Sequence, residues 1–399
     1  MVRSSSGARE QAPARLMSVQ RLPWWLIPLI GFAADLALVL FVQPHSAVRD
    51  EVVFYPAALA FAHAGVCPSL EFLRHYAAPQ APLALYLAGR LLAVVPSLLL
   101  LRIANALLMA AALLRFSWFA WRRFEENATL ATALLVLNPY VHLVATHFYT
   151  DALYFLLVVL VVTRSASRSA WLPLTLLPLV RQFGVIFAVG EALQATGEKR
   201  VCKAATALLT LAPLCALILL WHGLAPDTPR AETAKTVHAT YGWLFPYVAT
   251  YHVAALGFYL APLAWRLPRT RRFWLTGAAF AIAYLLAPAH QNFSAQLVDS
   301  GVTTLGYFQR LALLLGPLGA QCVLLAFAFL GGGLVGETFA VPSASSWFVA
   351  LFIALSVLNF QAWDKYLLDV LPAALVAILA RPLIPAGRSR SSDAARSRS

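Results

Sequence analysis

Long apolar runs separated by short polar segments dominate this sequence. The first run extends from about Trp24 to Val42, close to the roughly 20 residues that a helix needs to cross a bilayer. The repetition predicts one all-α, polytopic transmembrane helical bundle of about 10–13 spans. The later runs lie at about 81–97, 99–120, 128–147, 151–163, 171–195, 203–222, 246–265, 273–288, 308–334, 345–360 and 366–380.

Composition agrees with a membrane protein and excludes an ordinary soluble one. Of the 399 residues, 61% are hydrophobic and only 12% are charged, which soluble globular chains do not show. The formal charge of +13 comes largely from arginines at both termini and between apolar runs, as is typical of cytoplasmic loops. We therefore expect no nucleic acid partner. The Ala- and Arg-rich composition and the short loops favour a bacterial inner membrane, and a eukaryotic endoplasmic reticulum stays open.

The first apolar run is expected to be an uncleaved membrane anchor. A positive segment precedes it, and no small-x-small cleavage site follows it. The loop after it, residues 44–80, is therefore predicted to lie outside the cytoplasm, with a short interfacial helix at 52–64. We further expect a disordered basic cytoplasmic N-terminus at 1–22, a single bundle at 23–380 and a disordered basic cytoplasmic tail at 381–399.

The orientation of the next spans is ambiguous in the sequence. If the runs at 81–97, 99–120 and 128–147 all cross, then Thr150 and Asp151 end in the cytoplasm. The pair Arg122 and Arg123 instead favours an arrangement in which one of the first two runs does not fully cross. Both arrangements stay open.

Polar residues at membrane depth are the candidates for chemistry. Each ionisable group there costs at least about 2.5–3.5 kcal/mol on insertion scales, so such groups are retained mainly for function. Four groups stand out, and all but the first lie at or near a predicted helix end. They are Asp50-Glu51, His147-Phe148-Tyr149-Thr150-Asp151, Arg181-Gln182 and Gln361-Ala362-Trp363-Asp364-Lys365-Tyr366.

These features together resemble the GT-C superfamily of polyprenyl-phosphate-sugar glycosyltransferases. The shared features are an N-terminal anchor, an acidic pair in the first outer loop, a short helix, a Pro-x-x-Pro-Leu entry into the next helix and a Thr-Asp at a later helix start. More locally, the chain is similar to the glucosyltransferases that add the terminal glucose to dolichyl-linked oligosaccharide. The local likeness is carried by Arg49-Asp50-Glu51, Tyr149-Thr150-Asp151 and Arg181-Gln182.

The resemblance implies an inverting hexosyltransferase that acts on the extracytoplasmic face. Asp50 maps onto the outer-loop acid of the family, so it is expected to be the general base for the acceptor hydroxyl, and Glu51 is expected to orient it or to bind sugar hydroxyls. Asp151 is expected to be a second catalytic carboxylate. The alternatives are that the acidic pair only anchors a helix end, and that Thr150 or Asp151 only caps a helix.

The remaining polar residues are expected to bind substrate. An arginine fork matches phosphate geometry, so Arg181 is the candidate contact for the lipid phosphate, with Lys365 as a second. Arg181 could instead extend to a helix end, and Lys365 could pair with Asp364. The rest of the expected substrate-binding set is Gln182, Tyr149, His147, Gln80 and Tyr55.

The expected partners are a polyprenyl-phosphate sugar donor, a lipid, glycan or protein acceptor, and membrane lipids. No cofactor or metal is indicated, although an acidic outer-loop pair can hold a divalent cation. The histidines His222, His238, His252 and His290 lack metal-ligand spacing and are expected at the surface. The triplet Gly331-Gly332-Gly333 is expected to be a flexible break.

Two other functional classes share this composition. A transporter or flippase for a lipid-linked sugar or other amphiphile would also have basic inner loops and an intramembrane arginine. Such folds usually consist of two related halves, and the sequence shows no such repeat. A structural membrane subunit would leave the intramembrane polar groups without a role.

Overall fold

The computed structural model describes residues 22–124, 127–163, 171–198, 200–267, 269–288, 306–359 and 363–380. Within these ranges the chain is all-helical and has no strand, which confirms the predicted all-α class. The predictions for the two disordered termini, apart from Leu22, lie outside the described residues.

Most helices lie in the predicted apolar runs, although several runs contain two helices, and the helices at 70–75 and 229–241 lie outside every run. In chain order they are α1 (Leu26–Phe41), α2 (Glu51–His63), α3 (Leu70–His75), α4 (Leu83–Leu92), α5 (Leu98–Arg123), α6 (Ala128–Val136), α7 (Pro139–Thr146), α8 (Asp151–Val162), α9 (Trp171–Val180), η3 (Gln182–Gly184), α10 (Val185–Gln194), α11 (Arg200–Leu209), α12 (Ala212–Trp221), α13 (Pro229–Tyr241), α14 (Pro246–Tyr259), α15 (Ala261–Ala264), α16 (Arg271–Leu286), α18 (Tyr307–Leu313), α19 (Gly316–Thr338), α20 (Ala344–Ser356), η4 (Asp364–Asp369) and α21 (Leu371–Leu379).

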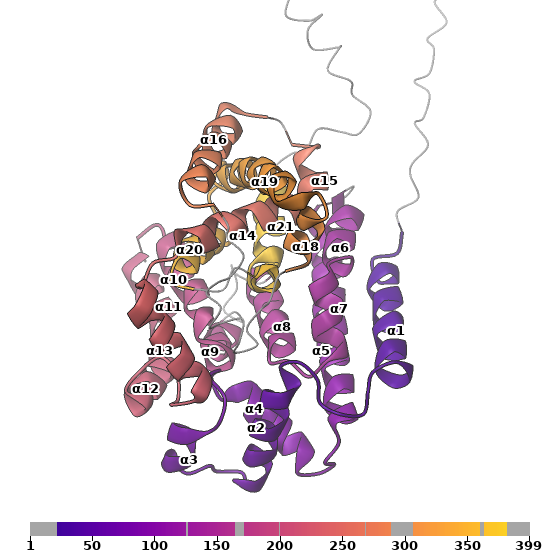
Figure 1. The fold of residues 1–399 in the computed structure, drawn as a ribbon, viewed down its shortest axis with the longest axis vertical. Coiled ribbons are helices and arrows are strands. Elements are labelled where there is room, and N and C mark those ends of the chain that lie inside the picture. The colour runs from indigo at the N-terminus through magenta and orange to yellow at the C-terminus, as the bar shows by residue number, and fades with distance from the viewer. Residues whose placement is uncertain are drawn as a thin grey trace, which may run out of the picture.

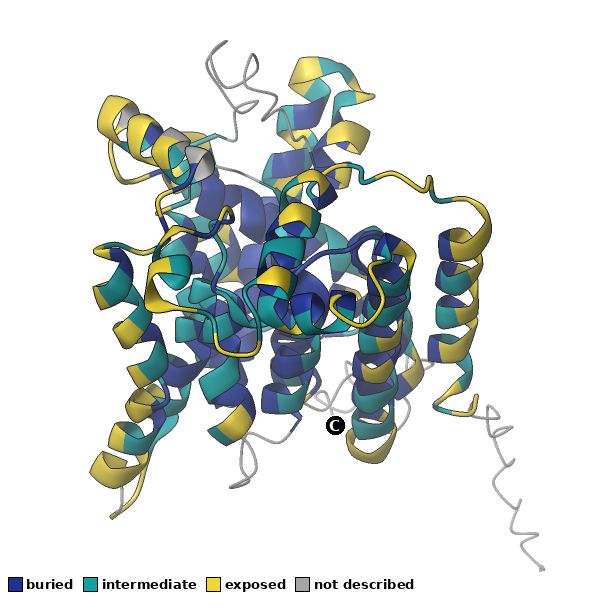
Figure 2. Cartoon of the chain, turned by 90° about the horizontal axis from the view of Figure 1, so that it is seen from below, coloured by how far each residue is buried: buried dark blue, intermediate teal, exposed yellow. Residues whose placement is uncertain are grey.

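The short helices α2, α3 and α4 gather at one end of the molecule, whereas α15, α16 and α19 lie at the other (Figure 1). The long helix α5 packs against α1, α6, α7 and α8, and α19 packs against α14 and α16. Viewed from below, the central helices are largely buried and the exposed residues lie towards the periphery (Figure 2). The fold is therefore a bundle with one short-helix end, and the candidate site described below is built around that end.

Two helices, α5 and α19, are long and apolar enough to cross a membrane, and the number rises to four if each bent pair is one span. The bent pairs are α6 with α7, at 55°, and α11 with α12, at 41°. Large apolar side chains such as Ile30, Leu219, Leu286 and Leu318 are exposed on the outside, as is expected where lipid is the solvent. The larger number of spans stays a prediction.

Helix α4 accounts for the ambiguity in the orientation of the first spans. Its 10 residues extend only about 15 Å, half the thickness of a bilayer core. It packs on α2, and Gly89 lets the two backbones approach, since a Cβ there would lie 2.6 Å from the Phe61 Cβ. The run at 81–97 therefore contains the second helix of the short α2–α4 pair. Asp50 and Asp151 lie close together, at the same end of the bundle.

The predicted interruption of the run at 171–195 is confirmed. Helix α9 contains Pro178 and ends at Val180, and Arg181 has extended backbone angles, φ −144° and ψ 130°. A short 3₁₀ turn then leads into α10. The break turns the Arg181 side chain into the protein between α8 and η4.

The prediction of a flexible break at Gly331-Gly332-Gly333 is wrong. All three glycines are buried inside the continuous helix α19. A Cβ at Gly331 would lie 1.9 Å from the Val253 carbonyl oxygen of α14, and one at Gly333 would lie 2.5 Å from the Phe273 ring of α16. The glycines are there because neighbouring helices approach very closely, as small residues allow in membrane bundles.

Candidate functional site

Five ionisable side chains from distant parts of the chain form one ionic cluster, which consists of Asp50, Lys365, Asp151, Arg181 and Asp369. The Lys365 Nζ lies 3.5 Å from Asp50 Oδ2 and 3.6 Å from Asp151 Oδ2. The Arg181 Nη1 donates a hydrogen bond to Asp151 Oδ1 and lies 3.4 Å from Asp369 Oδ1. Carboxylates and cations therefore alternate through the cluster, which is how buried charges are usually compensated.

Asp50 is the most accessible member of the ionic cluster. Its side chain is 22% exposed, whereas that of Lys365 is 5% exposed and those of Asp151 and Asp369 are similarly buried. A substrate that approaches from outside the bundle therefore meets the Asp50 carboxylate first. This is the position that a general base for an incoming hydroxyl would need.

The neighbouring acid, Glu51, faces the interior and is completely buried. Its Oε1 accepts from Arg102 Nε at 2.8 Å and from the Phe148 backbone N–H at 2.7 Å, and its Oε2 accepts from Arg102 Nη2 at 2.5 Å and from the Val48 N–H at 3.0 Å. Burial by itself raises the pKa of the Glu51 carboxyl, but these hydrogen bonds outweigh burial and hold the pKa below its ordinary value. Glu51 is therefore an ionised anchor, which favours its orienting role.

Two polar residues of α5 hold the two acid-bearing turns together. Arg102 also donates to the carbonyl oxygens of Pro44 and Ser46, at 2.5 and 3.1 Å. Asn105 Nδ2, one helical turn further, donates to the carbonyl oxygens of His147 and Tyr149 at 2.9 and 2.8 Å. Residues three apart share a helix face, so α5 positions Asp50 and Asp151 relative to each other.

Arg102 and Asn105 are functional candidates that the sequence did not reveal. They lie inside the run at 99–120, where apolar neighbours on both sides hide them. The available signal was their spacing, because two hydrogen-bonding residues three apart on one face of a membrane helix point at a common partner.

The capping alternative for the start of α8 is not what the structure shows. Thr150 occupies the N-cap position, and its side chain makes no capping hydrogen bond. Its Oγ1 is buried and has no hydrogen-bond partner among the described residues. Asp151, the first residue of the helix, directs its carboxylate to Arg181 and Lys365 instead.

Asp364 and Lys365 point to different partners and do not form the pair that the sequence left open. Asp364 accepts from the hydroxyls of Tyr140 and Tyr259, both at 2.6 Å, and from the Phe308 N–H at 3.1 Å. These bonds fix η4, and the next residue, Lys365, then reaches the ionic cluster across the ring of Tyr149, 4.4 Å from its centroid. Asp364 is a structural anchor for Lys365.

In the ionic cluster, Arg181 lies next to two aromatic rings. Its guanidinium carbon is 5.7 Å from the Tyr154 ring centroid and 5.6 Å from that of Tyr366. Two carboxylates, Asp151 and Asp369, neutralise its charge. Asp369 was not among the residues predicted from the sequence, because it lies in the apolar run at 366–380.

Four predicted substrate-binding residues make their described contacts outside the ionic cluster. Gln182 Nε2 donates to the carbonyl oxygens of Pro79 and Leu224 at 2.8 and 3.0 Å, which ties the outer loop to the segment after α12. Tyr55 is a half-buried residue that packs on the core. The described side-chain hydrogen bonds of His147 are to residues of α7, and Gln80 accepts a hydrogen bond within the outer loop through its carbonyl oxygen.

No group of His, Cys, Asp or Glu side chains in the described ranges is arranged to hold a metal ion. The expectation that His252 is a surface group is wrong, because it is buried, with Nδ1 2.8 Å from the Ser356 hydroxyl and Nε2 3.2 Å from the Trp363 carbonyl oxygen. His222 is exposed as expected. His290 lies outside the described residues.

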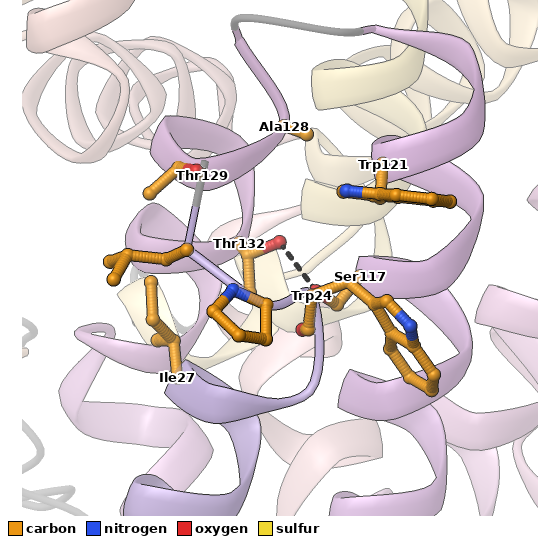
Figure 3. Close-up of a pocket in the computed structure, with 9 residues that line it drawn as sticks. Trp24, Ile27, Ser117, Trp121, Ala128, Thr129 and Thr132 are labelled. Atoms are coloured by element: carbon orange, nitrogen blue, oxygen red, sulfur yellow. Dashed lines mark hydrogen bonds between the residues drawn. The ribbon is translucent and has the colours of Figure 1, made fainter. Parts of the chain in front are cut away.

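A separate small pocket lies where the start of α1 meets α5 and α6 (Figure 3). Two of its hydroxyls bond in sequence: Thr132 Oγ1 donates to Ser117 Oγ at 3.1 Å, and Ser117 donates to the Trp24 carbonyl oxygen. This pocket holds no ionisable side chain, and the candidate site is therefore the ionic cluster.

Comparison with known proteins gives no relative for this chain: no protein-family model, no curated protein and no solved structure matches it.

Proposed function

We propose that the chain is a multi-pass membrane glycosyltransferase of the GT-C kind, located in a bacterial inner membrane. It moves a hexose, with inversion, from a polyprenyl-phosphate donor to a lipid, glycan or protein acceptor at the extracytoplasmic face. In this topology α1 and α5 cross the membrane, and α2 to α4 lie at the outer surface.

The observation that carries this proposal is the meeting of Asp50, Asp151 and Lys365 in one cluster. The residues come from three segments that are distant in the sequence, and the Lys365 Nζ is within 3.6 Å of both carboxylates. Charged groups buried at the end of a membrane bundle are costly, so their convergence supports a functional site. The accessible carboxylate is Asp50, the residue that the sequence resemblance favours as the base.

The proposed reaction uses these residues in distinct roles. The acceptor oxygen attacks the anomeric carbon, its proton passes to the Asp50 carboxylate, and the bond from the anomeric carbon to the phosphate oxygen breaks, which releases polyprenyl phosphate. General-base catalysis of this kind contributes typically about 10²–10⁴-fold. Lys365 lies between the two carboxylates and compensates their charge, and Glu51 fixes the turn that presents Asp50.

The deciding experiment is sugar transfer by the purified protein in lipid, with a small panel of radiolabelled polyprenyl-phosphate hexoses. The wild type is expected to release polyprenyl phosphate, and Asp50→Asn is expected to lose about 10²-fold or more of this turnover. Asp227→Asn is the matched control, because Asp227 is an exposed acid that pairs with an exposed lysine. Full turnover by Asp50→Asn at a normal protein level would contradict the proposal.

The second candidate function is a transporter or flippase for a lipid-linked sugar or other amphiphile. The arginine within the bundle, Arg181, and the bent helix pairs suit that class as well. The same reconstituted protein distinguishes the two functions: movement of the labelled lipid across the bilayer without release of polyprenyl phosphate would assign the chain to transport. A metal requirement is tested in the same assay with a chelator.

A further inference from the structure

Both cations of the ionic cluster are already engaged with carboxylates. Lys365 lies between Asp50 and Asp151, and Arg181 lies between Asp151 and Asp369. Three carboxylates and two cations leave the cluster formally with an excess of negative charge. A phosphate that arrives there is repelled unless a further cation accompanies it.

Arg49 is the cation next to the cluster that has no such engagement. It precedes Asp50 in the chain, and its side chain is exposed. Among the residues that the structure describes, none forms a hydrogen bond or ion pair with its guanidinium. Its charge is near enough to act on the side chains of His147 and Tyr149, which line the turn before Asp151.

The backbone at Arg49 supports a use for this side chain. Its φ of +55° lies in the left-handed region, and His222 is the other non-glycine residue with positive φ in the described ranges. His222 ends helix α12, where such a conformation is common. Arg49 instead lies in the turn that directs Asp50 outward and Glu51 inward, where glycine would fit without strain. An arginine at a position that favours glycine is consistent with a role for the side chain itself.

We infer that Arg49 binds the phosphate of a lipid phosphate at the rim of the ionic cluster, in place of Arg181 and Lys365. This inference rests on the proposed function for the identity of the lipid. A guanidinium binds two phosphate oxygens at once, and an exposed arginine can move with the phosphate as the substrate enters. Arg181 and Lys365 then position the acids.

The strained backbone allows a test that separates the side chain from the fold. Arg49→Gly removes the charge and relieves the left-handed strain, and Arg49→Asn removes the charge with a residue that tolerates this conformation. Arg49→Lys keeps the charge without the fork. Arg122→Gln is the control, because Arg122 is exposed and lies twenty residues further along α5 than Arg102, about 30 Å away at 1.5 Å per residue.

The measurement is binding of radiolabelled farnesyl phosphate to the full-length protein in phosphatidylcholine nanodiscs, with farnesol and inorganic phosphate as comparison ligands. We expect Arg49→Gly and Arg49→Asn to bind farnesyl phosphate about 10- to 100-fold more weakly. Arg49→Lys should lose less, and Arg122→Gln should bind as the wild type does. The melting temperature of Arg49→Gly should equal or exceed that of the wild type.

Four results would overturn the inference. One is wild-type affinity for farnesyl phosphate in Arg49→Gly. Another is an equal loss of affinity for farnesol in that variant, which would mean that Arg49 does not contact the phosphate. The third is no farnesyl phosphate binding by the wild type. Competition by inorganic phosphate at the same concentrations would assign Arg49 to a free anion and overturn the lipid phosphate. Because binding needs no sugar transfer, failure of the glycosyltransferase proposal would not by itself change this outcome.

Discussion

Glu51 and Arg102 form a buried, two-point ion pair across 51 positions of the chain, with Nε to Oε1 at 2.8 Å and Nη2 to Oε2 at 2.5 Å. The pair joins the first outer loop to α5, and the Phe148 N–H that also reaches Glu51 adds the turn before α8. One buried carboxylate therefore fixes both segments that carry the acids of the ionic cluster.

Breaking this pair should destabilise the protein strongly. Glu51→Gln or Arg102→Met leaves one buried partner without its counter-charge, which typically costs about 3–5 kcal/mol. The double variant Glu51→Gln/Arg102→Met should lose less than the sum of the two single losses, since no charge is left uncompensated. Thermal unfolding of the purified variants measures this, and additive losses would show that the two side chains do not act as a pair.

The same carboxylate predicts a loss of stability in acid. The folded pKa of Glu51 lies below its unfolded value of about 4.3. The contribution of Glu51 to the free energy of unfolding is therefore fully present above the unfolded pKa, and it is lost as the pH falls through the folded pKa. The melting temperature should drop in this range by more in the wild type than in Glu51→Gln. Parallel pH profiles of the two proteins would contradict the assignment.

Replacing Lys365 should lower activity more than the loss of one surface charge would, because Lys365 lies between two carboxylates. Lys365→Met leaves Asp50 and Asp151 without the cation between them, and we expect the proposed sugar transfer to fall by about 10²-fold or more because the Asp50 carboxylate is no longer held in place. Lys365→Arg should retain part of the activity. Lys235→Met is the control, because Lys235 also pairs with two acids, Asp227 and Glu232, but all three side chains are exposed.

An equal loss of sugar transfer in Lys235→Met would mean that the assay responds to the overall charge of the protein. Wild-type turnover in Lys365→Met, with the protein correctly folded, would remove Lys365 from the site. The two lysine variants therefore separate the charge of the ionic cluster from the charge of the surface.

We expect larger residues at the buried glycines of α19 to lower the stability of the protein through packing. Gly331→Ala places a methyl group where the Val253 carbonyl oxygen now lies, and forcing apart tightly packed helices typically costs about 1–3 kcal/mol. Cys322→Val, at an exposed position of the same helix, should be near neutral. Equal melting temperatures for both variants would show that the close approach of α19 and α14 at Gly331 does not limit the size of the residue there.

Local patterns predicted the helices well, because each depends on residues that are neighbours in the chain. The run at 151–163 starts at the residue where α8 starts, and the helix expected at 52–64 is α2 (Glu51–His63). Arg181 was expected to interrupt its run, and it does. Such features follow from apolar periodicity and from single helix-breaking residues.

The partners within the site could not be predicted in this way. Asp50 and Lys365 are 315 positions apart, and no local pattern relates them. The charge of Arg181 looked available for phosphate, because its carboxylate partner Asp369 is hidden in an apolar run. Which cations remain free for a ligand depends on tertiary pairing, and the role inferred for Arg49 became visible only when the pairs were known.

We expect replacement of Asn105 to lower turnover by more than its effect on stability would explain. Asn105→Leu keeps the size of the side chain but removes the donors to the carbonyl oxygens of His147 and Tyr149, which costs about 1–3 kcal/mol where carbonyls stay buried and unpaired. The turn before Asp151 should then shift relative to Asp50. A displacement of about 1 Å in such a site can cost about 10²-fold in rate.

The control for this variant is Ser117→Ala on the same helix, which removes a buried hydroxyl that bonds to Thr132 and Trp24. Twelve residues of α5 separate the two positions, about 18 Å at 1.5 Å per residue. Both variants should lower the melting temperature, but only Asn105→Leu should lower the turnover number of the folded protein. If Ser117→Ala loses turnover to the same degree, Asn105 acts through stability and α5 does not position the acids.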